Sequence, residues 1–156
     1  MIVEAKWAIK SWSTLKKHID SSEYEELGRT IENQKIYEEK MKQIKTKYND
    51  IESFINESII SKLLTENAQN IDGIIDFDAK LYLKKNDFPY ALEPNIDHLL
   101  LWSTNKLQAG HVPPPHVKSF ISKHLGPETT YLWLVNPPHL QSIPGVYHGH
   151  LFVKKY

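Results

Sequence analysis

The chain has 156 residues, no cysteine and a formal net charge of zero, with 19 basic and 19 acidic residues. This length is typical of one domain, and the missing cysteines exclude disulfides and thiolate metal sites. The balanced charge argues against duplex nucleic acid as a partner, which normally requires a basic surface. The first residues lack the features of a signal peptide, and no apolar run reaches the roughly 18 residues that cross a membrane, so we expect a cytoplasmic or nuclear protein.

The composition changes near residue 85. All nine prolines lie between Pro89 and Pro144, and seven of the eight histidines follow residue 97, whereas most charged residues come earlier. We therefore expect one domain, residues 1–156, made of a helical part (residues 1–84) and a sheet part (residues 85–156) that carries the functional site.

Two short helices are predicted before the longest one. Ser13 can cap a helix over residues 14–19, and Ser21 or Ser22 can cap a second one that Gly28 ends in the left-handed conformation. The only arginine of the chain, Arg29, follows directly. It could form a salt bridge or contact a carbonyl at the helix end, or its guanidinium could bind a phosphate in a bidentate manner.

A long helix is predicted over residues 30–48, with one apolar stripe made of Tyr37, Met41, Ile44 and Tyr48. Asp50 can cap a fourth helix. Residues 65–85 fit either a helix or a pair of strands, and we favour a helix for the end of this segment. Together these helices would form a layer that covers a sheet.

The second half has the pattern of strands. Apolar runs predict strands over residues 97–103, 131–135 and 146–153, and a helix over residues 116–125 that follows three prolines and ends at Gly126. Only about ten residues join the last two strands, which is too short for a parallel crossover, so these strands should be antiparallel neighbours. The expected fold is α+β, with an N-terminal helical layer packed on a small, mainly antiparallel sheet.

Two histidines lie two residues apart in the last predicted strand. His148 and His150 therefore share a face, which Phe152 continues, because strand side chains alternate. Gly149 between them indicates a close approach to the backbone. Two imidazoles on one face can hold a phosphate, with one acting as nucleophile, or a metal ion; alternatively they have only a structural role.

Polar and aromatic residues near this strand could complete a ligand site. Such convergence in an apolar region is typical of small-molecule sites. The side chains that we select as ligand-binding candidates are Asn136, Gln141, Ser142, His98 and Trp102. Both Trp102 and the Phe88-Pro89-Tyr90 segment could instead be core aromatics.

The chain resembles a family of unknown function. Its signature runs through Trp12-Ser13-Thr14-Leu15, Phe88-Pro89-Tyr90, Asn136-Pro137-Pro138, Gln141-Ser142-Ile143-Pro144 and His148-Gly149-His150. These blocks are similar to those of the fungal N-acetylglucosamine-induced protein family. That resemblance implies no activity, ligand or catalytic residue.

The last 65 residues also resemble the histidine triad superfamily, whose members hydrolyse or transfer nucleotides at a phosphate. The resemblance implies a histidine-triad-like sheet, with His150 as the nucleophile, His148 as the first triad member and Asn136, Gln141 and Ser142 as supporting groups. Phe152 stands where the third histidine should be, and it cannot donate a hydrogen bond.

Three functions remain open at this point. The first is binding of a small phosphorylated molecule or nucleotide, with possible hydrolase or nucleotidyl-transferase activity through His150 and His148. The second is a non-catalytic binding module, and the third is a metal site built on the same two histidines. We expect no cofactor, no duplex nucleic acid and no membrane as partners.

Overall fold

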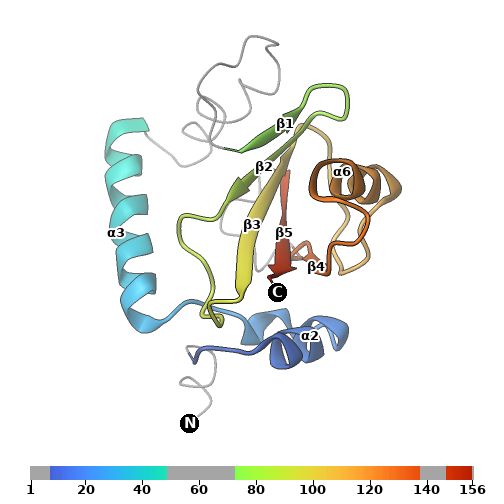
Figure 1. The fold of residues 1–156 in the computed structure, drawn as a ribbon. Helices are drawn as coiled ribbons and strands as arrows, with labels where there is room; N and C mark the ends of the chain where they lie inside the picture. The colour runs from blue at the N-terminus through green and yellow to red at the C-terminus, as the bar shows by residue number, and fades with distance from the viewer. Residues whose placement is uncertain (1–7, 49–72, 138–146, 156) are drawn as a thin grey trace.

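The computed structural model describes residues 8–48, 73–137 and 147–155. Within them, the chain forms an antiparallel sheet of five strands in the order β1-β2-β3-β5-β4 (Figure 1). The strands are β1 (Ile74–Asp76), β2 (Leu81–Lys85), β3 (Ile96–Ser103), β4 (Tyr131–Leu134) and β5 (Tyr147–Lys154). The predicted α+β class, the three predicted strands and the antiparallel pairing of β4 with β5 are confirmed.

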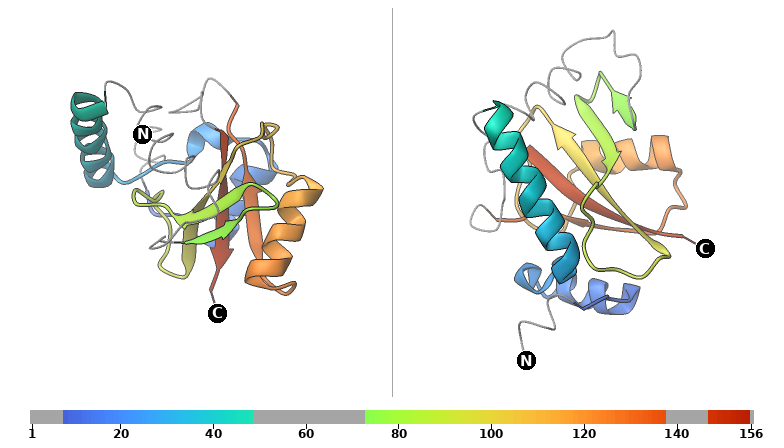
Figure 2. Two further views of the ribbon diagram at one scale, coloured as in Figure 1. Left: turned by 90° about the horizontal axis from the view of Figure 1, so that it is seen from above. Right: turned by 90° about the vertical axis from the view of Figure 1, so that its left-hand side faces the viewer.

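The helices surround this sheet. They are α2 (Trp12–Asp20), the short 3-10 helix η1 (Tyr24–Glu26), α3 (Ile31–Tyr48) and α6 (Pro115–Leu125). Figure 2 shows α3 alongside the sheet and α2 at one end of it. The long helix and the helix after the prolines are confirmed within one residue of their predicted starts.

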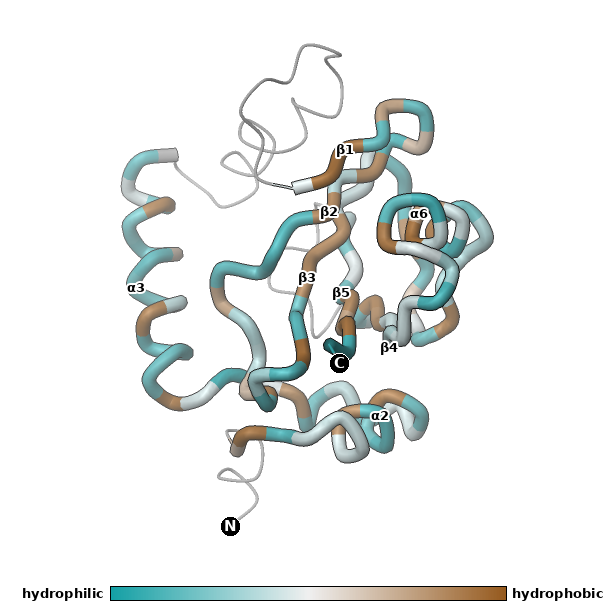
Figure 3. The backbone as a smooth tube through the Cα atoms, in the orientation of Figure 1, coloured by the Kyte–Doolittle hydropathy of each residue, from teal (hydrophilic) through white to brown (hydrophobic). Residues whose placement is uncertain are grey.

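Each face of the sheet packs against a different helix. On one face, Val117, Phe120 and Ile121 of α6 join a cluster that includes Leu101 and Leu151. On the other face, α2 contributes to a second cluster, in which Leu15 and Ile19 meet Ile96, Leu134 and Phe152. In Figure 3 the apolar segments concentrate in the strands and on α6, whereas α3 is mostly hydrophilic. The core is thus split into two layers by the sheet.

The predicted helix caps near the start of the chain need correction. Ser11, and not Ser13, caps α2, because its hydroxyl accepts the Thr14 N–H at 3.3 Å. The second predicted helix is only the 3-10 turn η1, and Leu27 already has an extended backbone. Gly28 is not among the glycines with positive φ. It belongs to an extended segment whose carbonyl accepts the Ala91 N–H at 2.7 Å.

The helix favoured for the end of residues 65–85 is wrong: the strand pair is present instead. Strands β1 and β2 form a hairpin in which Ile75 lies opposite Tyr82. Asp76 supports the turn, since its Oδ1 accepts the Ala79 N–H at 3.1 Å. The sheet therefore begins about ten residues before the predicted boundary between a helical and a sheet part. The fourth predicted helix lies outside the described residues.

The glycine of β5 is explained by packing. A Cβ atom on Gly149 would lie 2.2 Å from Cη2 of Trp133, a distance that no side chain tolerates. The indole of Trp133 therefore lies directly on the β5 backbone, on the face of the sheet that α6 covers. The predicted close approach at Gly149 is present, and the approaching group is this indole.

Among the described residues, no helix is long and apolar enough to cross a membrane.

Candidate functional site

The pairing of β3 with β5 gathers the candidate residues. His98 lies opposite Phe152, and Trp102 lies opposite His148. Because residues that face each other across antiparallel strands point to the same side, these four and His150 share one face of the sheet. This is the face that α2 partly covers and α6 does not.

The centre of the site is a direct contact between two buried histidines. His98 Nε2 lies 2.8 Å from His150 Nδ1, and the two residues are 2% and 6% exposed. Burial lowers the pKa of His98 to about 3 and holds the pKa of His150 well below 6.5. The positive charge of Arg29 lowers both pKa values further. At neutral pH both rings are uncharged, so each carries a single N–H.

Backbone geometry fixes which nitrogen of His98 carries its proton. The Tyr90 N–H donates to His98 Nδ1 at 3.0 Å. The Asn86 amide, held by the Phe88 N–H on its Oδ1, points its Nδ2 at the same nitrogen, 3.5 Å away. Nδ1 is thus an acceptor. The proton of His98 sits on Nε2 and is donated to His150 Nδ1.

The proton on His98 Nε2 also determines the tautomer of His150. Since its Nδ1 accepts, its proton sits on Nε2, which faces the side-chain amide of Asn136 at 3.4 Å. The Asn136 atom at this distance is Nδ2, and because two N–H donors cannot bond each other, we assign the amide the reversed orientation, with Oδ1 towards His150 Nε2. The Asn136 amide also hydrogen-bonds the Tyr90 phenol. His150 Nε2 is therefore a hydrogen-bond donor with a long, weak partner.

Aromatic rings enclose the two histidines. The Tyr90 ring stacks on His150 with centroids 5.3 Å apart, and Phe152 stacks on His98 at 4.6 Å. His148 lies edge-on to His150 at 5.6 Å. It is half-buried, and its ring lies 4.9 Å from that of Trp102. His148 is therefore the more exposed of the two histidines of β5.

The structure brings most of the predicted site residues together. His98, Asn136 and His150 form one hydrogen-bonded chain, and His148 and Trp102 extend it along the same face. Trp102 is buried, which agrees with the core role considered for it. Two further candidates lie outside the described residues: Gln141 and Ser142.

Two participants were missed by sequence reasoning. Tyr90 supplies both a backbone donor and a stacking ring, although the sequence had indicated only a core or stacking aromatic. Asn86 holds His98 from the turn after β2. The signal for Asn86 is its position directly after a strand and two residues before Phe88, where an asparagine commonly bonds the backbone ahead of it.

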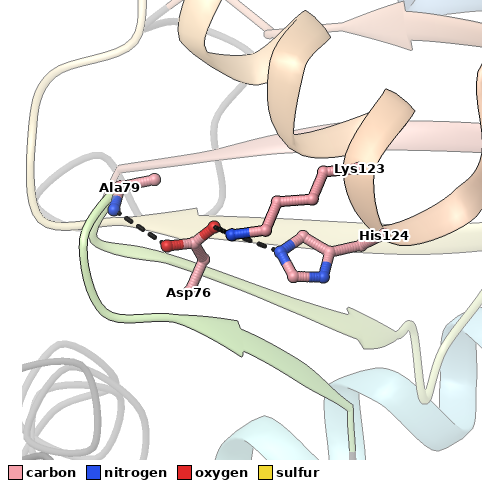
Figure 4. A network of polar contacts seen from close by, with 4 residues as sticks. All are labelled: Asp76, Ala79, Lys123 and His124. Atoms are coloured by element: carbon pink, nitrogen blue, oxygen red, sulfur yellow. Dashed lines mark hydrogen bonds and ion pairs between the residues drawn. The ribbon is translucent and has the colours of Figure 1, made fainter.

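A second polar cluster lies on the opposite face of the sheet. Asp76 Oδ2 lies 3.1 Å from His124 Nε2 and 3.4 Å from Lys123 Nζ (Figure 4). The hydrogen bond from His124 lowers the pKa of Asp76 to about 2, with help from the Ala79 N–H. This cluster ties the β1–β2 hairpin to the end of α6, and its role is structural.

The fold and this histidine site define an α+β protein with a buried, neutral imidazole pair. A family model for proteins of unknown function (DUF3605) matches residues 11–154, so the chain belongs to that family.

Two known proteins are similar to this chain. An uncharacterized protein of Saccharomyces cerevisiae, YPL067C, is 28% identical over 156 residues, which cover 91% of this chain and 77% of the yeast protein. The crystal structure of HTC1 superimposes with a TM-score of 0.62 at 24% identity, covering 96% of this chain and 86% of HTC1. The likeness to HTC1 supports the fold.

Proposed function

We propose that this protein binds a small phosphorylated molecule at the face that carries His148 and His150. The proposal rests on the buried contact of His98 with His150 Nδ1, which assigns the proton of His150 to Nε2, where the nearest partner is the Asn136 amide at 3.4 Å. A donor held in place in a low-dielectric site forms strong bonds with an anionic oxygen. Nucleotides are the first ligands to test, because the Tyr90 ring stacks on His150 and the Trp102 ring lies against His148.

The second, more specific part of the proposal is catalysis by His150. The resemblance to histidine triad proteins suggests hydrolase or nucleotidyl-transferase chemistry, in which His150 Nε2 would attack phosphorus. Attack requires a lone pair on Nε2, whereas the proton chain from Tyr90 through His98 places a proton there. Catalysis therefore demands that the proton leaves Nε2, while binding does not. Binding is the better supported half of the proposal.

The experiment is a panel of nucleotides and sugar phosphates. Thermal shift measures binding, and ³¹P NMR measures turnover, for the wild type, for His150→Gln and for His116→Gln. Glutamine can still accept the His98 proton, so the first variant should remain folded. His116 is exposed on α6 and serves as a matched histidine control. We expect a shift in the wild type and the control that His150→Gln loses. No shift and no turnover across the whole panel would end the proposal.

A non-catalytic binding module is the second candidate, and Phe152 favours it. Its ring is fully buried and stacks on His98, in the position where a histidine triad would need a third imidazole. A thermal shift without any turnover would decide for this candidate. If the partner were a protein, His148 and His150 could be replaced without loss of its binding.

A metal site is the third candidate and has the least support. The His98–His150 contact already uses the facing nitrogens of both rings. Among the described residues, no three histidine or acidic side chains are grouped as metal ligands. Metal analysis of protein purified without a histidine tag tests this candidate, and a stoichiometric metal would restore it.

The proposal also includes the class of partner and the location of the protein. A net charge of zero favours a small anionic molecule over duplex nucleic acid. We place the protein in the cytoplasm or nucleus, and imaging of a tagged full chain would test that.

A further inference from the structure

Arg29 lies beside the histidine site although it is far away in the sequence. Its Nε donates to the Phe88 carbonyl at 2.7 Å, and its Nη1 donates to Gln34 Oε1 at 3.3 Å. The guanidinium also lies over the Tyr37 ring, 3.9 Å from its centroid, and 5.8 Å from the centroid of Tyr90. Tyr90 is the residue that stacks on His150, so Arg29 and the histidine pair contact the same tyrosine.

The segment that carries Arg29 is hydrogen-bonded to the loop before β3. The carbonyl of Gly28 accepts the Ala91 N–H at 2.7 Å, and the Ala91 carbonyl accepts the Lys10 N–H at 2.9 Å. Arg29 is therefore held against residues 88–91, the segment whose Tyr90 N–H orients His98. Its guanidinium is positioned before any ligand arrives, which lowers the entropic cost of binding.

Arg29 has no acidic partner in the described part of the chain. None of the ion pairs there includes it, and only two of its five N–H donors have acceptors. Burial lowers the pKa of its guanidinium, with Tyr37 and Tyr90 acting in the opposite direction. A partly buried cation without a counter-ion is unfavourable unless an anion completes it.

We propose that Arg29 forms an anion subsite that receives the phosphate group of the ligand. Within the described residues, three of its N–H groups have no acceptor, which is enough for a bidentate contact with phosphate oxygens. Cation–π contacts with Tyr37 and Tyr90 help to hold the charged group in place. This inference rests on the proposed function and names the group that the ligand must carry.

The chain itself offers a sharp test, because Arg29 is its only arginine. Protein labelled with ¹⁵N and made without a tag has a single arginine Nε signal. We expect added pyrophosphate to shift that signal saturably and to slow rotation of the guanidinium. Succinate serves as the carboxylate arm. A response to succinate but not to pyrophosphate overturns the phosphate assignment, and no response to either overturns the subsite.

Variants provide an independent measurement. Arg29→Gln should weaken pyrophosphate binding about tenfold or more, because charge-assisted bonds are lost. Arg29→Lys should recover only part of the affinity, since lysine lacks the planar fork. Lys118→Gln, exposed on α6, should change nothing. Equal pyrophosphate affinity in Arg29→Gln and wild type would refute the inference. The wild-type NMR titration still decides if Arg29→Gln does not fold.

The failure of this inference can be told from that of the proposed function. If pyrophosphate shifts the ring nitrogens of His150 but not the Arg29 signal, the histidine face binds phosphate and Arg29 has a structural role. If neither group responds to pyrophosphate, to nucleotides or to sugar phosphates, both proposals fail.

Discussion

His98 donates the proton on its Nε2 to His150 Nδ1 across 2.8 Å, and so a backbone N–H eight residues before His98 determines the protonation of a ring on another strand. The hydrogen bonds that run from the Tyr90 N–H to the Asn136 amide assign the tautomer of both histidines. The N–H of His150 is the donor that the proposed ligand would use. Burial keeps the pair neutral, because it lowers the pKa of both rings.

The tautomers give the first prediction. Long-range ¹H–¹⁵N correlation spectra at neutral pH should show both His98 and His150 protonated at Nε2 only. The exposed His116 provides the internal reference. A signal from a protonated Nδ1 on His150 would contradict the proton chain and would make Nε2 available for attack.

Stability should fall in mild acid. His98 has a pKa of about 3 when folded and 6.5 when unfolded, and the pKa of His150 is lowered in the same direction. Below about pH 6.5 the unfolded chain therefore binds more protons, so stability is lost as the pH falls towards the folded pKa. Each histidine should contribute about 1.4 kcal/mol per pH unit. Urea unfolding at pH 7.5, 6.5, 5.5 and 4.5 measures this, and an unchanged free energy of unfolding between pH 7.5 and 4.5 would contradict it.

Gly149→Ala should destabilise the sheet by about 1–3 kcal/mol, because its methyl group has to displace the Trp133 indole. Chemical denaturation gives the free energy of unfolding. The double-mutant cycle with Trp133→Leu supplies the control, since the glycine substitution should cost much less once the indole is gone. Additive losses would show that the contact is not the cause.

Phe152→His should not create an enzyme. The ring is buried between apolar side chains of α2 and β4, where an imidazole lacks a partner, and we expect a loss of about 1–3 kcal/mol. Phe152→Leu is the control for the loss of ring stacking on His98. The ³¹P assay with the nucleotide panel checks turnover, and new activity in Phe152→His would revive the complete triad as a functional model.

Asp76→Asn should loosen the link between the hairpin and α6. Removing the carboxylate from His124 and Lys123 should cost about 1 kcal/mol at neutral pH. The wild-type contribution should persist down to about pH 4 and vanish near pH 2, because the pKa of Asp76 falls from 3.8 to about 2 on folding. Lys123→Gln should have little effect, since this lysine is mostly exposed. A pH profile of Asp76→Asn identical to that of the wild type would refute this role.

Local signals predicted the elements with clear boundaries. The prolines and Gly126 frame α6, and the apolar run after Asn95 marks β3. For the segment of β1 and β2, a strand pair was one of two alternatives and a helix was favoured, because the turn of the hairpin lacks the usual sequence signal. Lys80 has a φ of 58° there, in a left-handed conformation that glycine or asparagine normally announces.

The sequence indicated which candidate residues share a face, but not the contacts between them. Alternation placed His148 and His150 on one face, and His98 was selected as a candidate. The contact between His98 and His150 depends on the β3–β5 register, which joins residues 52 positions apart. Tyr90 and Arg29 lie in loops, and the conformation of a loop cannot be predicted from sequence periodicity. These contacts depend on which strands pair over long sequence distances, and short sequence patterns do not indicate that pairing.

The position of β5 between β3 and β4 has a consequence for folding kinetics. Among the described strands, β1, β2 and β3 pair in chain order, whereas β4 pairs with β5 alone. β4, which follows α6, cannot join the β1-β2-β3 part of the sheet until β5 pairs with both β3 and β4. This pairing is non-local and should limit the folding rate. The same pairing brings His150 to His98, so the histidine pair and the completed sheet form in one event. If the proposed ligand binds at this pair, it binds only the assembled sheet and should therefore slow unfolding of the last strand.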